Sequence, residues 1–145
     1  MILEAKQTEK YEVVVGVPDD LFVNGKYEDN LEKVIDKWQE FAKLYYEDTD
    51  IYVSAIAISG KAVYNADWGC PPHGERVFAF HCTANREFIK SENDLRLYEK
   101  GVLYIAKKLK KEFNQSTITI TKLSSLGCKV YYMTNENVKS EVEYE

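Results

Sequence analysis

Two long stretches with apolar residues at helical spacing constrain the fold of this chain most. One begins at Asp29, where Glu32 completes a capping box, and the other begins near Ser91, with Asp94 in the same role. A continuous apolar stripe of this kind is typical of a helix that buries one face on a core. The stripes consist of Leu31, Val34, Ile35, Trp38, Phe41, Ala42 and Tyr45, and of Leu95, Tyr98, Val102, Ile105, Ala106, Leu109 and Phe113.

Runs rich in β-branched and aromatic residues flank both helical stretches and predict strands. Residues 77–82 are apolar on both faces, as in a central strand. The order of elements predicts an α+β fold, a mostly antiparallel sheet with two main helices packed on it. We expect one domain over residues 1–134 and a charged, frayed tail over 135–145. The expected strands are 10–17, 51–58, 62–65, 77–82, 116–123 and 127–134, with turns at 18–20, 24–25 and 59–61.

Charge and cysteine content limit the partners of the chain. Its 145 residues carry a net charge of −5, which argues against wrapping a DNA or RNA polymer. Three cysteines without paired spacing fit a reducing compartment, and no apolar run is long enough for a membrane helix. We therefore expect a cytoplasmic protein with no membrane partner.

The arginines are concentrated in one part of the sequence. All three lie between residues 76 and 96, and a guanidinium grips phosphate through two parallel hydrogen bonds. Arg86 precedes the second helix, whose N-terminus offers free amides and the positive end of the dipole. Arg86 is therefore the expected main anion contact, whereas Arg96 could instead pair with Glu92 or Glu99. The predicted ligand-binding residues are Trp68, Arg76, Asn85, Arg86, Phe88, Asn93 and Arg96.

Three aromatic side chains leave alternatives open. Trp68, in a loop rich in proline and glycine, either packs on its own domain or stacks on a base or a neighbouring subunit. Phe88 either offers its ring to an adenine or packs onto the second helix. Leu97 and Tyr104 form a second apolar face, which is either scattered surface or a subunit interface.

The sequence offers only weak signals for catalysis. Cys70, His73, His81 and Cys82 are potential zinc ligands, but adjacent strand residues point to opposite faces, so we expect no metal. His81-Cys82-Thr83 is half of the motif pair of two-histidine phosphoesterases. Asp67 and Glu75 could act as general bases, but neither lies in a motif. These residues favour binding without turnover; a phosphodiesterase that uses His81 and an inhibitor acting through a protein surface are the alternatives.

Three segments, 67–71, 83–88 and 115–120, resemble small phage proteins of the first Thoeris anti-defence family. These proteins are sponges that sequester signals made by TIR-domain immune enzymes. The resemblance implies a homo-oligomer built from dimers, for example a hexamer. It also implies a protein that is not an enzyme, has no cofactor and acts in the cytoplasm of the infected bacterium. The implied partner is a cyclic ADP-ribose-type ligand or a cyclic oligonucleotide. The implied pocket uses Phe88, Asn85 or Asn93, and Arg86 or Arg96.

Overall fold

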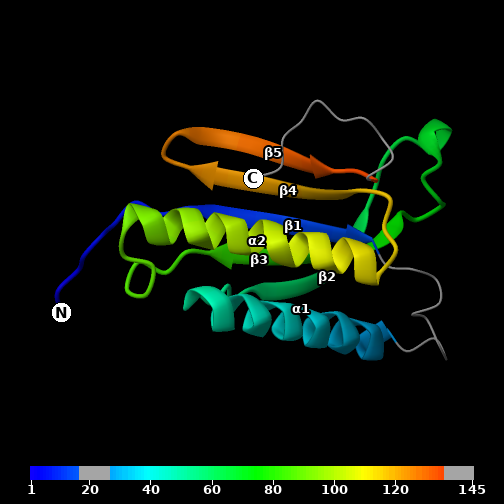
Figure 1. Ribbon diagram of the computed structural model, residues 1–145. Helices are drawn as coiled ribbons and strands as arrows, with labels where there is room; N and C mark the ends of the chain where they lie inside the picture. The colour runs from blue at the N-terminus through cyan, green and yellow to red at the C-terminus, as the bar shows by residue number, and fades with distance from the viewer. Residues whose placement is uncertain (17–26, 136–145) are drawn as a thin grey trace.

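A computed structural model of the chain describes residues 1–16 and 27–135. Five strands form one sheet in the order β2-β3-β1-β4-β5, and every neighbouring pair is antiparallel. Both helices lie on the same face of this sheet (Figure 1), so the expected α+β class is confirmed. The elements are β1 (Lys10–Gly16), α1 (Tyr27–Thr49), β2 (Ile56–Ala62), the 3-10 turn η3 (Ala66–Trp68), β3 (Glu75–Thr83), α2 (Glu92–Glu112), β4 (Ile118–Ser124) and β5 (Gly127–Met133).

The core lies between the sheet and the two helices. Alternate residues of a strand point to opposite faces, and one alternate set is buried along β1 and along β3 from Phe78 onward. The Trp38 ring of α1 stacks on Phe80 of β3, with centroids 4.4 Å apart. Its indole N–H donates to the Val53 carbonyl at 3.1 Å, so this buried donor is satisfied. The buried residues of β1 and β3 are Tyr11, Val13, Val15, Phe78, Phe80 and Cys82.

The predicted helices are present, with one correction at their starts. Ser91 caps α2, and the reciprocal hydrogen bonds with Asp94 form the predicted capping box. The first helix begins at Tyr27, so Asp29 lies inside α1 and is not its N-cap. The expected turns at 18–20 and 24–25, and the tail after residue 135, lie outside the described residues.

The predicted hairpin of 51–58 with 62–65 is wrong. β2 pairs with β3 along its whole length, from Ile56 opposite His81 to Ala62 opposite Glu75. The expected turn at 59–61 therefore lies inside a strand, where Gly60 has open space around it and does not force a turn. Ile51 and Val53 are buried although they precede the strand, because they pack into the core without joining the sheet.

The second apolar face of α2 packs against α1. The Tyr45 hydroxyl donates to the Leu97 carbonyl at 2.5 Å, and its ring lies 5.5 Å from that of Tyr104. Gly101 permits this approach, because a Cβ there would lie 2.6 Å from the Tyr45 ring. Leu97 and Tyr104 are partly buried and pack against the core of their own chain, so this apolar face is explained without a subunit interface, which stays a prediction.

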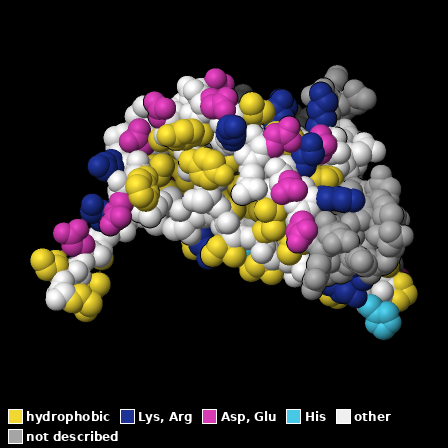
Figure 2. Space-filling view, turned by 90° about the horizontal axis from the view of Figure 1, so that it is seen from below, with side chains coloured by type: hydrophobic (Ala, Val, Ile, Leu, Met, Phe, Trp, Pro, Cys, Tyr) yellow, Lys and Arg dark blue, Asp and Glu magenta, His cyan; other side chains and the backbone are white. Residues whose placement is uncertain are grey.

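The N-terminal segment projects from the described surface. Figure 2 shows the N-terminal arm extending from the body with hydrophobic side chains at its tip, and Met1, Ile2 and Leu3 are almost fully exposed. None of the described helices has the length and hydropathy that a membrane crossing needs.

Candidate functional site

The loop of residues 63–74, which joins β2 to β3, has an unusually constrained backbone. Asn65 caps the η3 turn by accepting a hydrogen bond from the Asp67 amide at 2.9 Å. Gly69, His73 and Gly74 have positive φ angles of 100°, 71° and 86°. Such conformations are disfavoured for residues other than glycine and persist where the surroundings fix them. The loop therefore returns the chain along one defined path to the start of β3.

This path brings Tyr64 against Glu75. The Tyr64 hydroxyl donates to Oε2 of Glu75 at 3.0 Å, and both side chains are exposed. This hydrogen bond to a carboxylate is the main reason why the pKa of Tyr64 lies above its usual value. The phenol therefore keeps its proton at neutral pH and remains a donor. By alternation along β3, Glu75 shares the sheet face of Val77 and His81, which points away from the helices.

An exposed aromatic ring lies in the same loop. Trp68 is 77% exposed, so the alternative in which it packs on its own domain is wrong. An indole so exposed offers a flat face for a base or another planar group. Together, the loop presents a carboxylate, a phenol and an indole at one end of the sheet, an arrangement suited to a cationic ligand with an aromatic part.

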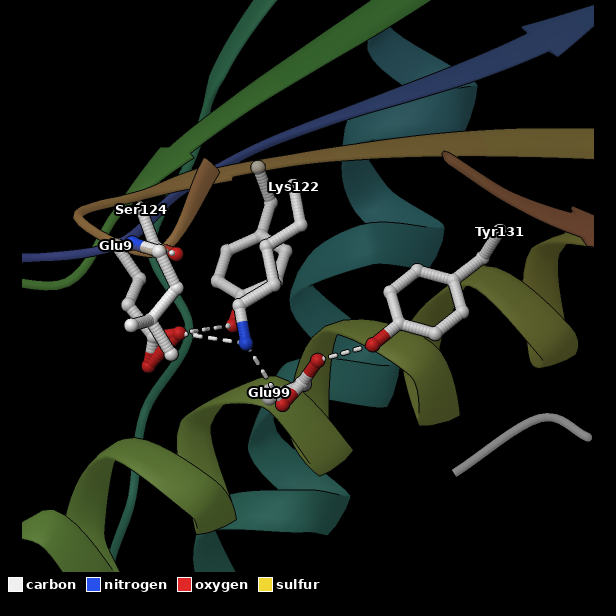
Figure 3. Close-up of polar contacts among 7 residues, drawn as sticks. Glu9, Glu99, Lys122, Ser124 and Tyr131 are labelled. Carbon is white, nitrogen blue, oxygen red and sulfur yellow. Dashed lines mark hydrogen bonds and ion pairs between the residues drawn. The ribbon is translucent and has the colours of Figure 1, made fainter. Parts of the chain in front are cut away.

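A second polar cluster lies at the opposite end of the sheet, beneath α2. It consists of Glu9, Glu99, Lys122 and Tyr131, and we call it the Lys122 cluster (Figure 3). The Lys122 ammonium lies 2.7 Å from Glu9 and 3.1 Å from Glu99, while the Tyr131 hydroxyl donates to Glu99. Burial alone would lower the pKa of Lys122, but its hydrogen bonds to both carboxylates hold that pKa above the usual value.

The charged groups of the Lys122 cluster pair with one another and are largely shielded from solvent. The side chains of Lys122, Glu9 and Glu99 are 14%, 15% and 18% exposed, and each carboxylate already contacts the ammonium. Burial and the hydrogen bond to Glu99 raise the pKa of Tyr131, which keeps its donor protonated. The cluster joins α2 to β4 and β5 and has no carboxylate left for a ligand.

The seven predicted ligand-binding residues do not come together. Trp68 and Arg76 belong to the loop end of β3, and Asn85, Arg86 and Phe88 follow its other end, next to Asn93 and Arg96 in the first turns of α2. Figure 1 shows these two regions at opposite ends of the molecule. Phe88 is 74% exposed, so it does not pack onto α2.

Arg86 has a structural role, and its expected anion contact stays a prediction. Its guanidinium donates to the carbonyls of Gln7, Ile89 and Lys90, each at 2.8 Å. The N-terminus of α2 is likewise occupied, because the Asp94 carboxylate accepts from the Lys90 and Ser91 amides at 3.3 Å. This carboxylate places a negative charge at the start of α2, which disfavours a second anion there. Within the described residues, Arg96 contacts Asn93 at 3.4 Å.

The histidines and cysteines do not converge. Among residues 1–16 and 27–135, no three His, Cys, Asp or Glu side chains lie close enough to hold a metal ion. His81 lies 3.5 Å from Glu12 on the sheet face away from the helices. Cys82 is buried on the helix side, where burial raises the pKa of its thiol to about 12. Its thiol is therefore a core group without nucleophilic character.

The comparisons with known proteins place the chain among lyases. A model of the SAM lyase family, where SAM is S-adenosylmethionine, matches residues 6–134, and the chain belongs to this family. A phage SAM lyase solved in complex with S-methyl-5′-thioadenosine superposes with a TM-score of 0.59 at 17% identity, over 96% of this chain and 98% of that one. A phage SAM lyase in its apo state gives 0.58 at 13% identity, over 96% and 99%. No curated protein matches the sequence.

These findings correct three expectations. Binding without turnover is wrong, because the family is one of enzymes. The expected cyclic ADP-ribose or cyclic oligonucleotide partner is wrong as well, since the solved relative holds S-methyl-5′-thioadenosine. The homo-oligomer built from dimers loses its basis, because Leu97 and Tyr104 are used within the chain. The Thoeris resemblance is not supported, although its coarser part, similarity to phage proteins, is.

Sequence reasoning named Glu75 but not its partner. Tyr64 and Glu75 form no recognisable motif, and the predicted return strand at 62–65 placed Tyr64 in the wrong element. The available signal was the loop itself: Pro71, Pro72 and two glycines within ten residues indicate a fixed path whose two ends must meet.

Proposed function

We propose that this protein cleaves SAM to S-methyl-5′-thioadenosine and a four-carbon fragment, with Tyr64 and Glu75 in its active site. The family supports the reaction class, and the ligand of the solved relative supports the product. That product keeps the methyl group and the adenosine. The bond that breaks therefore joins the sulfonium to the methionyl Cγ, and its electron pair stays on sulfur. Because a lyase adds no water, an oxygen of the substrate's own carboxylate bonds to Cγ and closes the four-carbon fragment into a lactone that keeps the ammonium.

The pairing of Tyr64 with Glu75 is the observation that carries the assignment. SAM has a sulfonium and an α-ammonium, so its site needs an accessible carboxylate. Glu75 is exposed and accepts a hydrogen bond from a neutral phenol, so its carboxylate is accessible to a ligand cation. Glu9 and Glu99 instead share Lys122 in an enclosed cluster.

The change of charge during the reaction decides which cation Glu75 holds. The sulfonium loses its charge as the S–Cγ bond breaks, so a carboxylate against it would stabilise the substrate more than the transition state. The α-ammonium keeps its charge throughout. Glu75 therefore serves the reaction better by binding the ammonium, while the Tyr64 hydroxyl fixes the carboxylate. Trp68, with its exposed ring, provides a stacking surface for the adenine.

The test is to incubate the purified protein with SAM and measure S-methyl-5′-thioadenosine by liquid chromatography. Glu75→Gln removes the charge and keeps the shape. A charge-assisted hydrogen bond of roughly 1.5–3 kcal/mol predicts a loss of kcat/KM of about 10- to 150-fold, expressed mainly in KM. Glu87→Gln changes an exposed glutamate at the other end of β3 and is the matched control.

Direct binding separates the role of Glu75 from a general defect. S-methyl-5′-thioadenosine lacks both the sulfonium and the ammonium, so Glu75→Gln should leave its dissociation constant within about twofold in calorimetry. If Glu75→Gln weakened the binding of S-methyl-5′-thioadenosine as well as that of SAM, Glu75 would shape the whole pocket. No product from the unaltered protein would refute the proposed activity.

The cellular role follows from the substrate. SAM is the methyl donor of DNA methyltransferases, so an enzyme that consumes it in the cytoplasm of an infected bacterium would starve SAM-dependent defences. We propose this anti-defence role, and the phage origin of the solved relatives supports it. Expression in bacteria should lower both intracellular SAM and DNA methylation, and Glu75→Gln should restore both.

A further inference from the structure

The two ends of the loop of residues 63–74 are joined by hydrogen bonds that pass through Cys70. The Tyr64 amide donates to the Cys70 sulfur at 3.5 Å, and the Cys70 thiol donates to the Pro71 carbonyl at 3.5 Å. The same Pro71 carbonyl accepts from the Gly74 amide at 3.1 Å, and Gly74 directly precedes Glu75. Contacts of 3.5 Å are ordinary for sulfur, whose atomic radius exceeds that of oxygen.

We infer that Cys70 is a positioning residue for the Tyr64–Glu75 pair. Its thiol ties the backbone of Tyr64 to the turn that leads into Glu75, so that the phenol and the carboxylate meet at 3.0 Å. The inference rests on the proposed function, because it assigns Cys70 a role in that same site. Both hydrogen bonds of Cys70 reach backbone atoms, the Tyr64 amide and the Pro71 carbonyl, so Cys70 positions the pair through the backbone.

The geometry separates Cys70 from the two other cysteines. Cys82 is buried in the core, and Cys128 is exposed at the start of β5, opposite Leu123 in the register. Cys70 is half-buried and bonds to backbone atoms on both sides. It therefore has the contacts of a cross-link within the loop, and Cys128 offers a matched control of the same residue type.

The test combines three variants with a double-mutant cycle. Cys70→Ala removes both hydrogen bonds but leaves the Glu75 charge that binds the ammonium, so KM should change little. The shifted carboxylate holds the substrate in a less reactive orientation, which should lower kcat by about 3- to 10-fold, in contrast to Glu75→Gln, which removes the charge and acts mainly on KM. Cys70→Ser keeps a donor and an acceptor and should recover part of the activity. In a Tyr64→Phe background, Cys70→Ala should change kcat by less than about 1.5-fold, because the phenol that it positions is gone. Cys128→Ala should leave kcat unchanged.

A second measurement does not depend on activity. Cys70→Ala should increase the amide hydrogen-exchange rate of Tyr64 several-fold in NMR, while the amides of β1 keep their protection. An active protein in which Cys70→Ala changes neither kcat nor this rate would overturn the inference and leave the proposed function standing. Equal losses with and without the Tyr64 hydroxyl would also overturn it. If the unaltered protein yields no product, the proposed function fails, and the exchange rate alone decides whether Cys70 orders Tyr64.

Discussion

At the scale of single residues, the same side-chain type has different tasks according to what surrounds it. Arg86 has the donors and the position expected of a phosphate ligand, yet three of its five N–H groups, one on each nitrogen, donate to carbonyls of its own chain. A guanidinium has several donors in a rigid fork, and the sequence does not reveal whether they are used by ligand or backbone. In this chain the fork joins the segment before β1 to the loop after β3.

We predict that Arg86→Ala lowers the free energy of unfolding by about 1–2 kcal/mol, because three backbone carbonyls lose a charged donor. Arg86→Lys should recover little of this, since an ammonium cannot reach all three carbonyls. Arg96→Ala, at an exposed position, is the control and should stay within about 0.5 kcal/mol. Urea unfolding measures the stability of all three variants. An Arg86→Ala midpoint equal to that of the unaltered protein would contradict the structural role of Arg86.

At the scale of elements, local signals predicted most of the fold. The Ser91–Asp94 capping box placed the start of α2 correctly, because the residues that make a cap lie within one turn. β2 was misplaced because the residues that complete it are those of β3, some twenty positions away. Ser59 and Gly60 are typical turn residues, and only pairing with Phe78 and Val77 holds them in a strand.

The site was predicted in part for the same reason. Glu75 could be named from its chemistry, but its contact with Tyr64 depends on the path of the intervening loop. That path is set by hydrogen bonds such as that between Gly74 and Pro71, which no residue pattern specifies. Around Arg86, Asn93 and Arg96 contact each other, whereas the Arg86 guanidinium donates to backbone carbonyls and the Phe88 ring is exposed.

Two glycines of the loop provide a matched prediction. Both have positive φ, but a Cβ on Gly74 would lie 3.0 Å from the Ala62 carbonyl oxygen, whereas one on Gly69 would meet nothing within 4 Å. Gly69→Ala should therefore cost only the left-handed backbone strain, about 1 kcal/mol, and Gly74→Ala clearly more. Thermal unfolding shows which of the two variants loses more stability. We also expect a larger fall of kcat in Gly74→Ala, because this substitution displaces the residue before Glu75. Equal costs would mean that the steric contact is relieved freely.

At the scale of the whole molecule, buried tyrosines set the response to alkaline pH. Burial is the main cause that raises the pKa of Tyr11, Tyr98 and Tyr131 above the usual value near 10. Below pH 10 both the folded and the unfolded states keep these protons, so the stability they carry is fully present. Above pH 10 the unfolded chain releases protons that the folded chain retains, and stability falls as the pH rises towards the folded pKa values.

We predict a denaturation midpoint that is constant from pH 8 to 9.5 and falls steeply above pH 10. Tyr98→Phe should flatten this fall, by up to about 1.4 kcal/mol per pH unit. It should cost little at pH 8, because the Tyr98 hydroxyl is buried without a hydrogen-bond partner within the described residues. Tyr132→Phe, at a side chain 50% exposed, should leave the slope unchanged. If stability fell equally steeply above pH 10 in Tyr98→Phe and in the unaltered protein, Tyr98 would not contribute to the alkaline loss of stability.

The loop between β2 and β3 also bears on how such an enzyme diverges. Tyr64, Cys70 and Glu75 lie on one uninterrupted stretch of chain at the rim of the sheet, and neither α1 nor α2 belongs to it. Under the proposed function, insertions, deletions and exchanges there would alter the chemistry while the layer of Phe78, Phe80 and Trp38 stays intact. The core can equally accumulate substitutions that preserve its volume without disturbing the rim. The hairpin of β2, the loop and β3 can therefore vary independently of the core. Replacing it by the corresponding hairpin of another family member is a direct route to chimeric enzymes.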